Sequence, residues 1–186
     1  MNLNIVALDL SLTATGVATR GEIMTLTERS IPKGSPPVEY VKRLHRMSAR
    51  IDRICRVADI VVIEGPSFGS SSAFAHDIGG LHGLVDVILL QREIPFAIVP
   101  PSSLKKYALG VGGGKNATKE LVLQAAARKT NHTFRNNNES DAFWLWQLAA
   151  CHYQHPYRVV MPQRNEEALK AIVWPALEER EEQRVG

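Results

Sequence analysis

The sequence has few cysteines, no long apolar run and almost no low-complexity sequence, and each absence excludes a class of protein. Cys55 and Cys151 have no metal-type spacing, so we expect two buried free thiols and no zinc site. No window holds the ~18 apolar residues that a membrane helix needs, and the N-terminus lacks the regions of a secretory signal. We therefore expect a soluble cytoplasmic protein that crosses no membrane.

The composition is that of one globular domain. The chain has 186 residues, 45% of them hydrophobic, which is enough for a sizeable core. Its net charge of +3 allows a polyanionic partner but does not require one. Where the charges lie is therefore more informative than their sum.

Hydrophobic periodicity predicts an α/β fold. Residues 4–10, 14–19 and 22–28 are typical of three strands in an antiparallel meander. Residues 59–64 and 95–99 are apolar runs that we expect to lie parallel to the first strand across helical crossovers. A first helix is expected from residue 35 onward, with an apolar side made of Val38, Val41, Leu44, Ile51 and Ile54. A short helix is expected after a cap at Ser102-Ser103. The other expected helices cover residues 73–91, 117–129, 139–153 and 165–173. This order predicts a central mixed five-stranded sheet flanked by helices.

Two acidic residues, Asp9 and Glu64, end strands that should lie side by side. Because the carboxyl ends of parallel strands meet at one edge of a sheet, both should point into one cleft. A single acid at a strand end often only meets solvent. Asp141 also has a structural interpretation, as an acid in the first turn of a helix that Asn138 caps.

Three converging carboxylates nevertheless repel one another unless a cation binds them. Mg²⁺ prefers hard oxygen ligands, and two such ions about 3.5–4 Å apart catalyse phosphodiester hydrolysis. The pattern therefore favours a metal-dependent nuclease site at Asp9, Glu64 and Asp141.

Several short motifs follow one another along residues 4–153. They are residues 6–11 with 15–18, residues 61–64 with Phe68, residues 104–119, and Asp141-Ala142 with His152. In order and spacing they resemble the RuvC-like Holliday-junction resolvases of the RNase H-like superfamily, whose phage-type members are included in the resemblance. The resemblance implies an RNase H-like nuclease domain over residues 1–153. We expect residues 154–186 to be a C-terminal extension with one short helix, which matches nothing in the family core.

The resemblance also implies an activity. It predicts a structure-selective DNA endonuclease, active in recombination or repair, that resolves Holliday junctions or other branched DNA. Asp9, Glu64 and Asp141 would be catalytic and would hold two Mg²⁺ ions, for which Mn²⁺ could substitute. Symmetric cutting of two strands implies a homodimer, and the apolar helix over residues 73–91 is a candidate interface.

One position departs from the family pattern. Three residues before the final Asp, where the family has an acid or sometimes His, this chain has Asn138. Its amide oxygen could complete the metal site. Glu139 is the alternative, although on a helix it would lie about 200° around from Asp141. The sequence leaves this choice open.

Basic and aromatic residues near these acids are candidates for DNA contact. Lys105, Lys106, Lys115 and Lys119 flank a glycine-rich segment that lacks P-loop spacing, and we expect them to bind phosphates rather than only solvent. Phe68, in the Gly/Ser-rich loop after Glu64, is predicted to insert between bases, with anchoring of that loop as the alternative. We expect Phe74 to anchor the loop, Trp144 to lie in the core, and Trp146 to pack against the extension or a partner. His76 and His82 are expected to be ordinary surface or core histidines.

Other functions remain open at this point. They include an RNase H-like nuclease for RNA or flaps, and a junction-binding protein that does not cleave. An ATPase or sugar kinase of the actin-like superfamily also has a first strand that ends in Asp before a Thr/Gly turn. That fold normally needs two such domains, and one domain in 186 residues argues strongly against it.

Overall fold

The computed structural model describes residues 2–66, 72–111, 117–130 and 132–177, with the backbone alone over 72–78. Five strands form one sheet in the order β3-β2-β1-β4-β5: β1 (Ile5–Asp9), β2 (Ala14–Ala18), β3 (Ile23–Thr27), β4 (Ile60–Glu64) and β5 (Phe96–Val99). The pairs β1–β2 and β2–β3 are antiparallel, whereas β1–β4 and β4–β5 are parallel. The predicted mixed five-stranded α/β sheet is confirmed.

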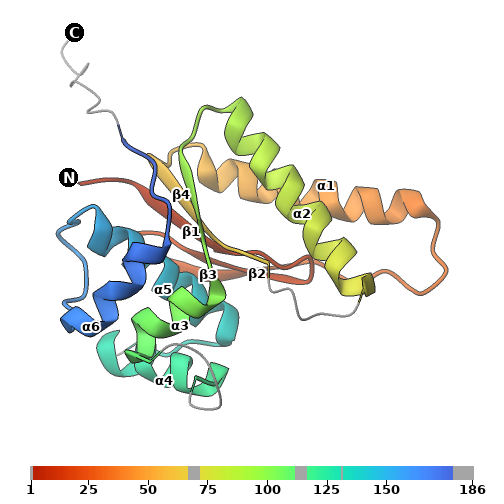
Figure 1. Cartoon of the computed structure of the whole chain (residues 1–186). Helices are drawn as coiled ribbons and strands as arrows, with labels where there is room; N and C mark the ends of the chain where they lie inside the picture. Colours follow the sequence, from red (N-terminus) through yellow and green to blue (C-terminus); the bar gives the residue numbers. More distant parts are fainter. Residues whose placement is uncertain (1, 67–71, 112–116, 131, 178–186) are drawn as a thin grey trace, which may run out of the picture.

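Helices cover both faces of the sheet (Figure 1). They are α1 (Pro37–Cys55), α2 (Ser72–Gln91), α3 (Pro101–Leu109), α4 (Lys119–Thr130), α5 (Asn137–His152), α6 (Gln163–Glu166) and the 3-10 helix η1 (Glu167–Ala171). Helices α1 and α2 lie on one face, and α3 to α6 lie on the other. Among the described residues, no helix combines the length and the apolar character that a membrane crossing needs.

Strand β1 shows why the apolar runs are continuous. Val6 and Leu8 belong to the core shared with α1 and α2, whereas Ile5 and Ala7 belong to the core shared with α5. A strand that is buried on both faces has no polar side, so it reads as an unbroken hydrophobic run.

Helix α5 is the central helix of the second layer. All of its residues from Glu139 to Cys151 are buried, as expected of a helix enclosed in a core. The indole nitrogen of Trp144 donates to the Val122 carbonyl at 3.1 Å, which confirms its predicted core position. Trp146 packs its ring 5.1 Å from that of His155 in the extension.

The two cysteines are also where the sequence predicted them. Cys55 and Cys151 are both buried and both are free thiols. Burial raises the pKa of the Cys55 thiol to about 12, so this side chain packs as a small apolar group.

Several helix boundaries differ from the prediction. Asn136, and not Asn138, caps α5, because its side-chain oxygen accepts a hydrogen bond from the Glu139 amide at 3.0 Å. Since α5 begins at Asn137, Asp141 lies in the second helical turn rather than in the first.

Helix α3 begins at Pro101, so Ser102 and Ser103 lie inside the helix instead of capping it. A proline fits the first turn, where its missing N–H has no helical partner to lose. Val38 and Val41, predicted on the apolar side of α1, are exposed at the end of this helix that projects past the sheet (Figure 1).

The described part of the extension packs against α3 and α5. The Asn165 amide nitrogen donates to the Tyr107 carbonyl at 2.7 Å in a buried contact. The ring of Trp174 stacks on that of His152, with ring centres 4.5 Å apart. The single helix predicted over residues 165–173 is instead a short α6 followed by η1.

Candidate active site

Three carboxylates meet at one edge of the sheet. Leu8 of β1 pairs with Ile63 of β4, so Asp9 and Glu64, the next residues, end their strands side by side. Asp141 reaches the same place from α5. One oxygen from each of the three carboxylates lies within 4.8 Å of the other two.

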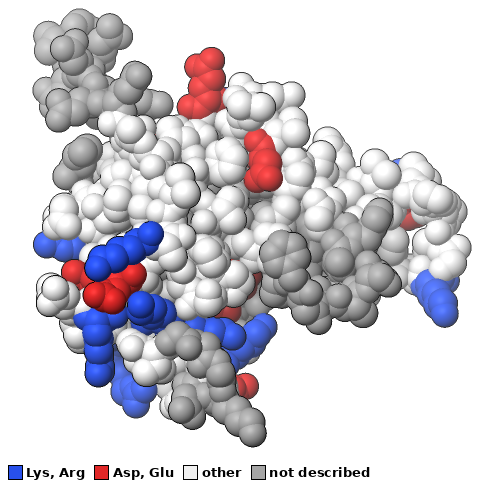
Figure 2. Space-filling view, in the orientation of Figure 1, with Lys and Arg blue, Asp and Glu red and all other residues white. Residues whose placement is uncertain are grey.

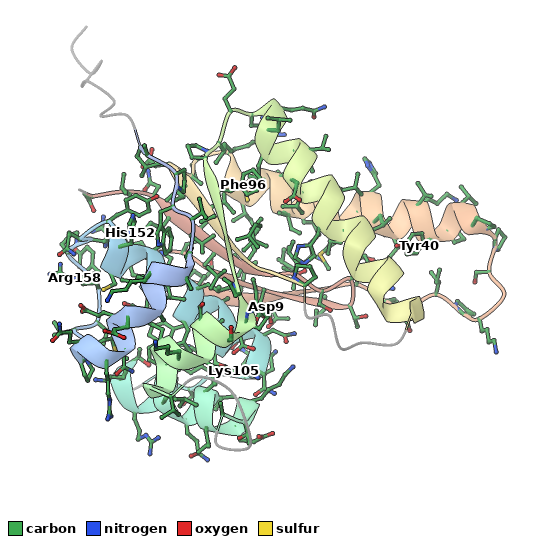
Figure 3. All side chains as sticks on the ribbon, viewed as in Figure 1. Asp9, Tyr40, Phe96, Lys105, His152 and Arg158 are labelled. Carbon is green, nitrogen blue, oxygen red and sulfur yellow. The ribbon has the colours of Figure 1, made fainter. Side chains whose placement is uncertain are left out.

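The carboxylates lie in an open cleft with a volume of about 430 Å³. Figure 3 shows Asp9 at this end of the sheet, beside the helix that carries Lys105. The other polar residues that line the cleft are Ser11, His82, Lys105, Lys119 and Asn138. The cleft therefore combines an acidic centre with two lysines.

The acids are costly to ionise together. Burial raises the pKa of Glu64 well above its usual range, and the charges of Asp9 and Asp141 raise it further. Burial also raises the pKa of Asp9, against the effect of its hydrogen bond with Glu64. For Asp141, burial and then the charge of Asp9 raise the pKa to about 7. Without a cation, the centre therefore retains protons near neutral pH.

A divalent cation fits this donor set. Carboxylate oxygens from three separate elements converge, and hard oxygens are the ligands that Mg²⁺ and Mn²⁺ prefer. The positive charge of such an ion would take the place of the retained protons.

Asn138 lies beside the three acids and lines the cleft. Its amide nitrogen donates to the Ala14 carbonyl at 2.6 Å. This contact uses a donor of the amide and leaves the lone pairs of the amide oxygen, so the oxygen can still act as a ligand.

Glu139 has a different environment. Its side chain is 1% exposed. One carboxylate oxygen accepts from the Arg135 amide at 2.8 Å, and the other accepts from the Thr25 hydroxyl at 3.2 Å. Glu139 thus ties α5 to β3 and is not among the residues that line the cleft.

The turn after Asp9 is fixed by Thr15. Its hydroxyl donates to the Ser11 carbonyl at 2.7 Å, and it accepts from the Ser11 amide at 3.1 Å. Thr15 is fully buried, so both hydrogen bonds are shielded from water. This local pair holds Ser11 at the wall of the cleft.

The predicted DNA-contacting residues fall into three groups. Lys105 and Lys119 line the cleft, and their charges lower the pKa of Asp141 against the effect of burial. Lys106 instead forms an ion pair of 3.8 Å with Glu167 of η1. Lys115 and Phe68 lie outside the described residues, as does the side chain of Phe74.

Figure 2 shows lysine and arginine side chains gathered over α3, α4 and α6, with acidic side chains among them. The surface over α3, α4 and α6 is therefore basic without being uniformly so. Such a surface favours contact with phosphates at several positions rather than at one point.

Two polar residues at the cleft were not predicted as site residues. Ser11 belongs to the turn after Asp9, and His82 comes from α2. We expected an ordinary packing role for His82, whose burial lowers its pKa. The sequence offers no motif for it, because only the packing of α2 against the sheet brings it near Glu64.

Solved structures with a similar fold include two structures of RuvC and one of a Holliday junction resolvase. Thermus thermophilus RuvC in complex with a Holliday junction substrate has a TM-score of 0.60 at 18% identity, over 78% of this chain and 91% of that chain. The chain has the RuvC-like fold. A second Thermus thermophilus RuvC structure also gives a TM-score of 0.60 at 18% identity, over 81% of this chain and 96% of that one.

The yeast mitochondrial Holliday junction resolvase Ydc2 is more distant, with a TM-score of 0.50 at 10% identity, over 91% of this chain and 81% of that chain. By sequence, no family model matches the chain, and no curated protein matches it significantly. The likeness thus establishes the RuvC-like fold, while the role of the cleft rests on its own residues.

Proposed function

We propose that this protein is a divalent-metal-dependent endonuclease that cuts branched DNA, with the four-way junction as its substrate. The observation that carries this proposal is the convergence of Asp9, Glu64 and Asp141 within 4.8 Å in an open cleft. The two cleft lysines and the RuvC-like fold add to it.

Six residues of the cleft have a role in this proposal. Asp9, Glu64 and Asp141 would hold two Mg²⁺ or Mn²⁺ ions, with the Asn138 oxygen as a further ligand. When bound, such ions supply a water that is activated at neutral pH and stabilise the charge on the leaving oxygen. Lys105 and Lys119 bind phosphates and so orient the strand across the acids.

The deciding experiment incubates the full chain and Mg²⁺ with a fixed four-way junction. Matched substrates are a linear duplex, a flap and an RNA–DNA hybrid of the same sequence. We expect paired cuts in the junction, none in EDTA, and little cutting of the linear duplex. Preferred cutting of the hybrid or the flap would assign another nuclease activity. Tight junction binding without cutting would indicate a binding protein, and ATP consumption would indicate an actin-like enzyme.

We further propose that the protein cuts as a homodimer through α2. Leu84, Val87 and Leu90 of this helix are exposed, with Val87 at 49% and Leu90 at 74%. They follow one another at a spacing of three residues, which forms an apolar stripe. Analytical ultracentrifugation should give twice the monomer mass, and Val87→Glu should give the monomer. A monomeric wild type that still makes paired cuts would contradict this.

We also propose that Phe68 acts as a wedge that inserts between bases at the junction centre. Phe68→Ala should then reduce cleavage of a fully paired junction more than cleavage of one with an unpaired centre. An equal loss on both substrates would favour the alternative, in which Phe68 anchors its loop.

A further inference from the structure

A second pocket, with a volume of about 460 Å³, lies at the opposite end of the sheet from the carboxylates. Because β2 runs antiparallel to β1 and Gly16 pairs with Asp9, Thr19, which follows β2, lies toward the end of the sheet where β1 begins. The pocket is formed by the β2–β3 turn, by α5 and by the extension. Its volume lies in the range of about 300–1,000 Å³ that is common for small-molecule sites.

The floor and rim of this pocket are rich in aromatic rings. Phe143 and Trp146 of α5 are buried side chains that line it. Tyr157 and His132 line it as well, and both are exposed to solvent. Flat rings on several sides suit a planar ligand, because stacking needs only a face on each partner.

Gln147 places a polar group among these rings. Its side chain is only 4% exposed, and its amide oxygen accepts from the Val159 amide at 2.7 Å. Within the described part of the chain, its amide nitrogen donates no hydrogen bond. An amide that is held at its oxygen and has free donors can read the polar edge of a ligand.

Arg20 places a positive charge at the mouth of the pocket. Its guanidinium donates to the Tyr157 hydroxyl at 2.8 Å and lies 4.4 Å from the centre of that ring. The Tyr157 amide in turn donates to the buried ring of His155 at 3.2 Å. Arg20 is therefore held in place, although within the described ranges no carboxylate pairs with it. A fixed guanidinium with unused donors favours a phosphate.

We propose that this pocket binds a nucleotide, with its base among the rings of Phe143, Trp146 and Tyr157, its base edge on the Gln147 amide, and its phosphate on Arg20. On α5, Gln147 lies about 240° around and about 9 Å along the helix from Asp141. The nucleotide site is therefore separate from the cleft and does not depend on the nuclease activity. The ligand is either a free mononucleotide or a nucleotide of a single DNA strand.

The test titrates the full chain with deoxynucleoside monophosphates, the matching nucleosides, inorganic phosphate and a short single-stranded oligodeoxynucleotide. EDTA is present, so that no metal recruits phosphate to the cleft. NMR follows the Gln147 side-chain amide and the Trp146 indole. We expect these signals to shift with mononucleotides, and to shift less with nucleoside or phosphate alone. Tighter binding of the oligodeoxynucleotide would identify the strand as the ligand, and tighter binding of the monophosphate would identify the free nucleotide.

Variants separate the parts of this site. Arg20→Ala should weaken nucleotide binding about tenfold and leave nucleoside binding unchanged, since it removes a charged hydrogen bond. Gln147→Glu keeps the oxygen that accepts from Val159 but removes the amide donors, and it should weaken both ligands. Arg128→Ala, which removes an exposed charge on α4, is the matched control and should change neither.

Two results would overturn the proposal. One is an absence of shifts at the Gln147 and Trp146 signals up to roughly 10 mM ligand, because a dissociation constant above this concentration means that no specific binding takes place. The other is binding that survives Arg20→Ala and Gln147→Glu, with shifts confined to the cleft. Asp9→Asn should leave this binding intact, so a failed nuclease assay does not bear on it.

Discussion

A Cβ atom on Gly16 would overlap the backbone of Asn138, lying 2.5 Å from its carbonyl carbon and closer still to its carbonyl oxygen. Gly16 pairs with Asp9 across the β1–β2 ladder, so this close approach sets how near α5 comes to the acidic centre. The glycine of the Thr15-Gly16 pair is thus required by space and not by an unusual backbone conformation.

Gly16→Ala should therefore push the start of α5 away from Asp9. We expect it to lower the free energy of unfolding by about 1–3 kcal/mol, as overpacking does, and to reduce cleavage further by displacing Asp141. Thermal unfolding and junction cleavage measure the two effects. Gly21→Ala is the matched control, because no atom lies within 4 Å of a Cβ built there. Equal behaviour of the two variants would contradict the steric argument.

Neutral replacements of the three acids should separate cutting from binding. Asp9→Asn, Glu64→Gln and Asp141→Asn each remove one charged ligand, and each should reduce cleavage by more than about a hundredfold. Junction binding, measured by gel shift without Mg²⁺, should persist, since it depends on lysines and shape. A fully active Asp9→Asn protein would disprove the metal site.

The fourth ligand can be tested by Mg²⁺ titration of cleavage. Asn138→Asp adds a charged oxygen beside Asp141, so half-maximal activity should require less Mg²⁺. Glu139→Gln should lower the melting temperature, because Glu139 is held by Thr25 and the Arg135 amide, and should leave the Mg²⁺ requirement unchanged. A shift of the Mg²⁺ midpoint in the Glu139 variant alone would reverse this assignment.

The cleft lysines should carry part of the salt dependence of junction binding. Lys105→Ala and Lys119→Ala should each weaken binding and reduce the slope of log K against log salt by up to about 0.9 per phosphate contact. Lys106→Ala is the comparison, because Lys106 pairs with Glu167, and its effect should be smaller. An unchanged slope for both cleft variants would indicate that these lysines contact solvent and not phosphates.

Stability of the metal-free protein should fall as pH rises. The folded-state pKa values of Asp9, Glu64 and Asp141 are raised above their usual values, so the folded state binds more protons than the unfolded state above about pH 4. Stability is then lost as pH rises from about 4 to about 9, where the last of the three acids ionises in the folded state, by about 1.4 kcal/mol for each unit of raised pKa in a group.

Melting temperatures in EDTA should therefore be lower at about pH 9 than at about pH 5, and Mg²⁺ should restore more stability at the higher pH. Glu64→Gln removes the carboxyl whose pKa is raised most, so it should flatten this dependence. A metal-free wild type whose melting temperature does not fall over this range would show that the three acids ionise without strain.

The fold and the acidic residues were predictable because they depend on local pattern. Strands buried on both faces give unbroken apolar runs, and acids at the ends of two such runs must meet if the strands are parallel. The cap of α5 was not predictable in this way. Asn136, Asn137 and Asn138 are equally good capping residues in isolation. The Asn136 amide nitrogen donates to the Thr25 hydroxyl at 2.9 Å, and this contact from distant β3 accompanies its role as the cap.

The environments of Lys106 and His82 could not be predicted either, because they also depend on contacts between residues far apart in the sequence. Glu167 lies far along the chain from Lys106, and only the packing of the extension on α3 brings them together. His82 reaches the cleft because α2 crosses the sheet near Glu64. Such contacts depend on tertiary packing, and neither periodicity nor spacing encodes them.

Because α5 is enclosed in the core, the acidic centre is attached to a part of the molecule that opens only rarely to solvent. The helix carries Asp141 and contacts β1, β2, β3 and β4 as well as α3 and α4. Its amides can exchange with solvent hydrogen only when much of the domain opens. A ligand held by Asp141 would thus slow hydrogen exchange throughout the core and not only around the cleft.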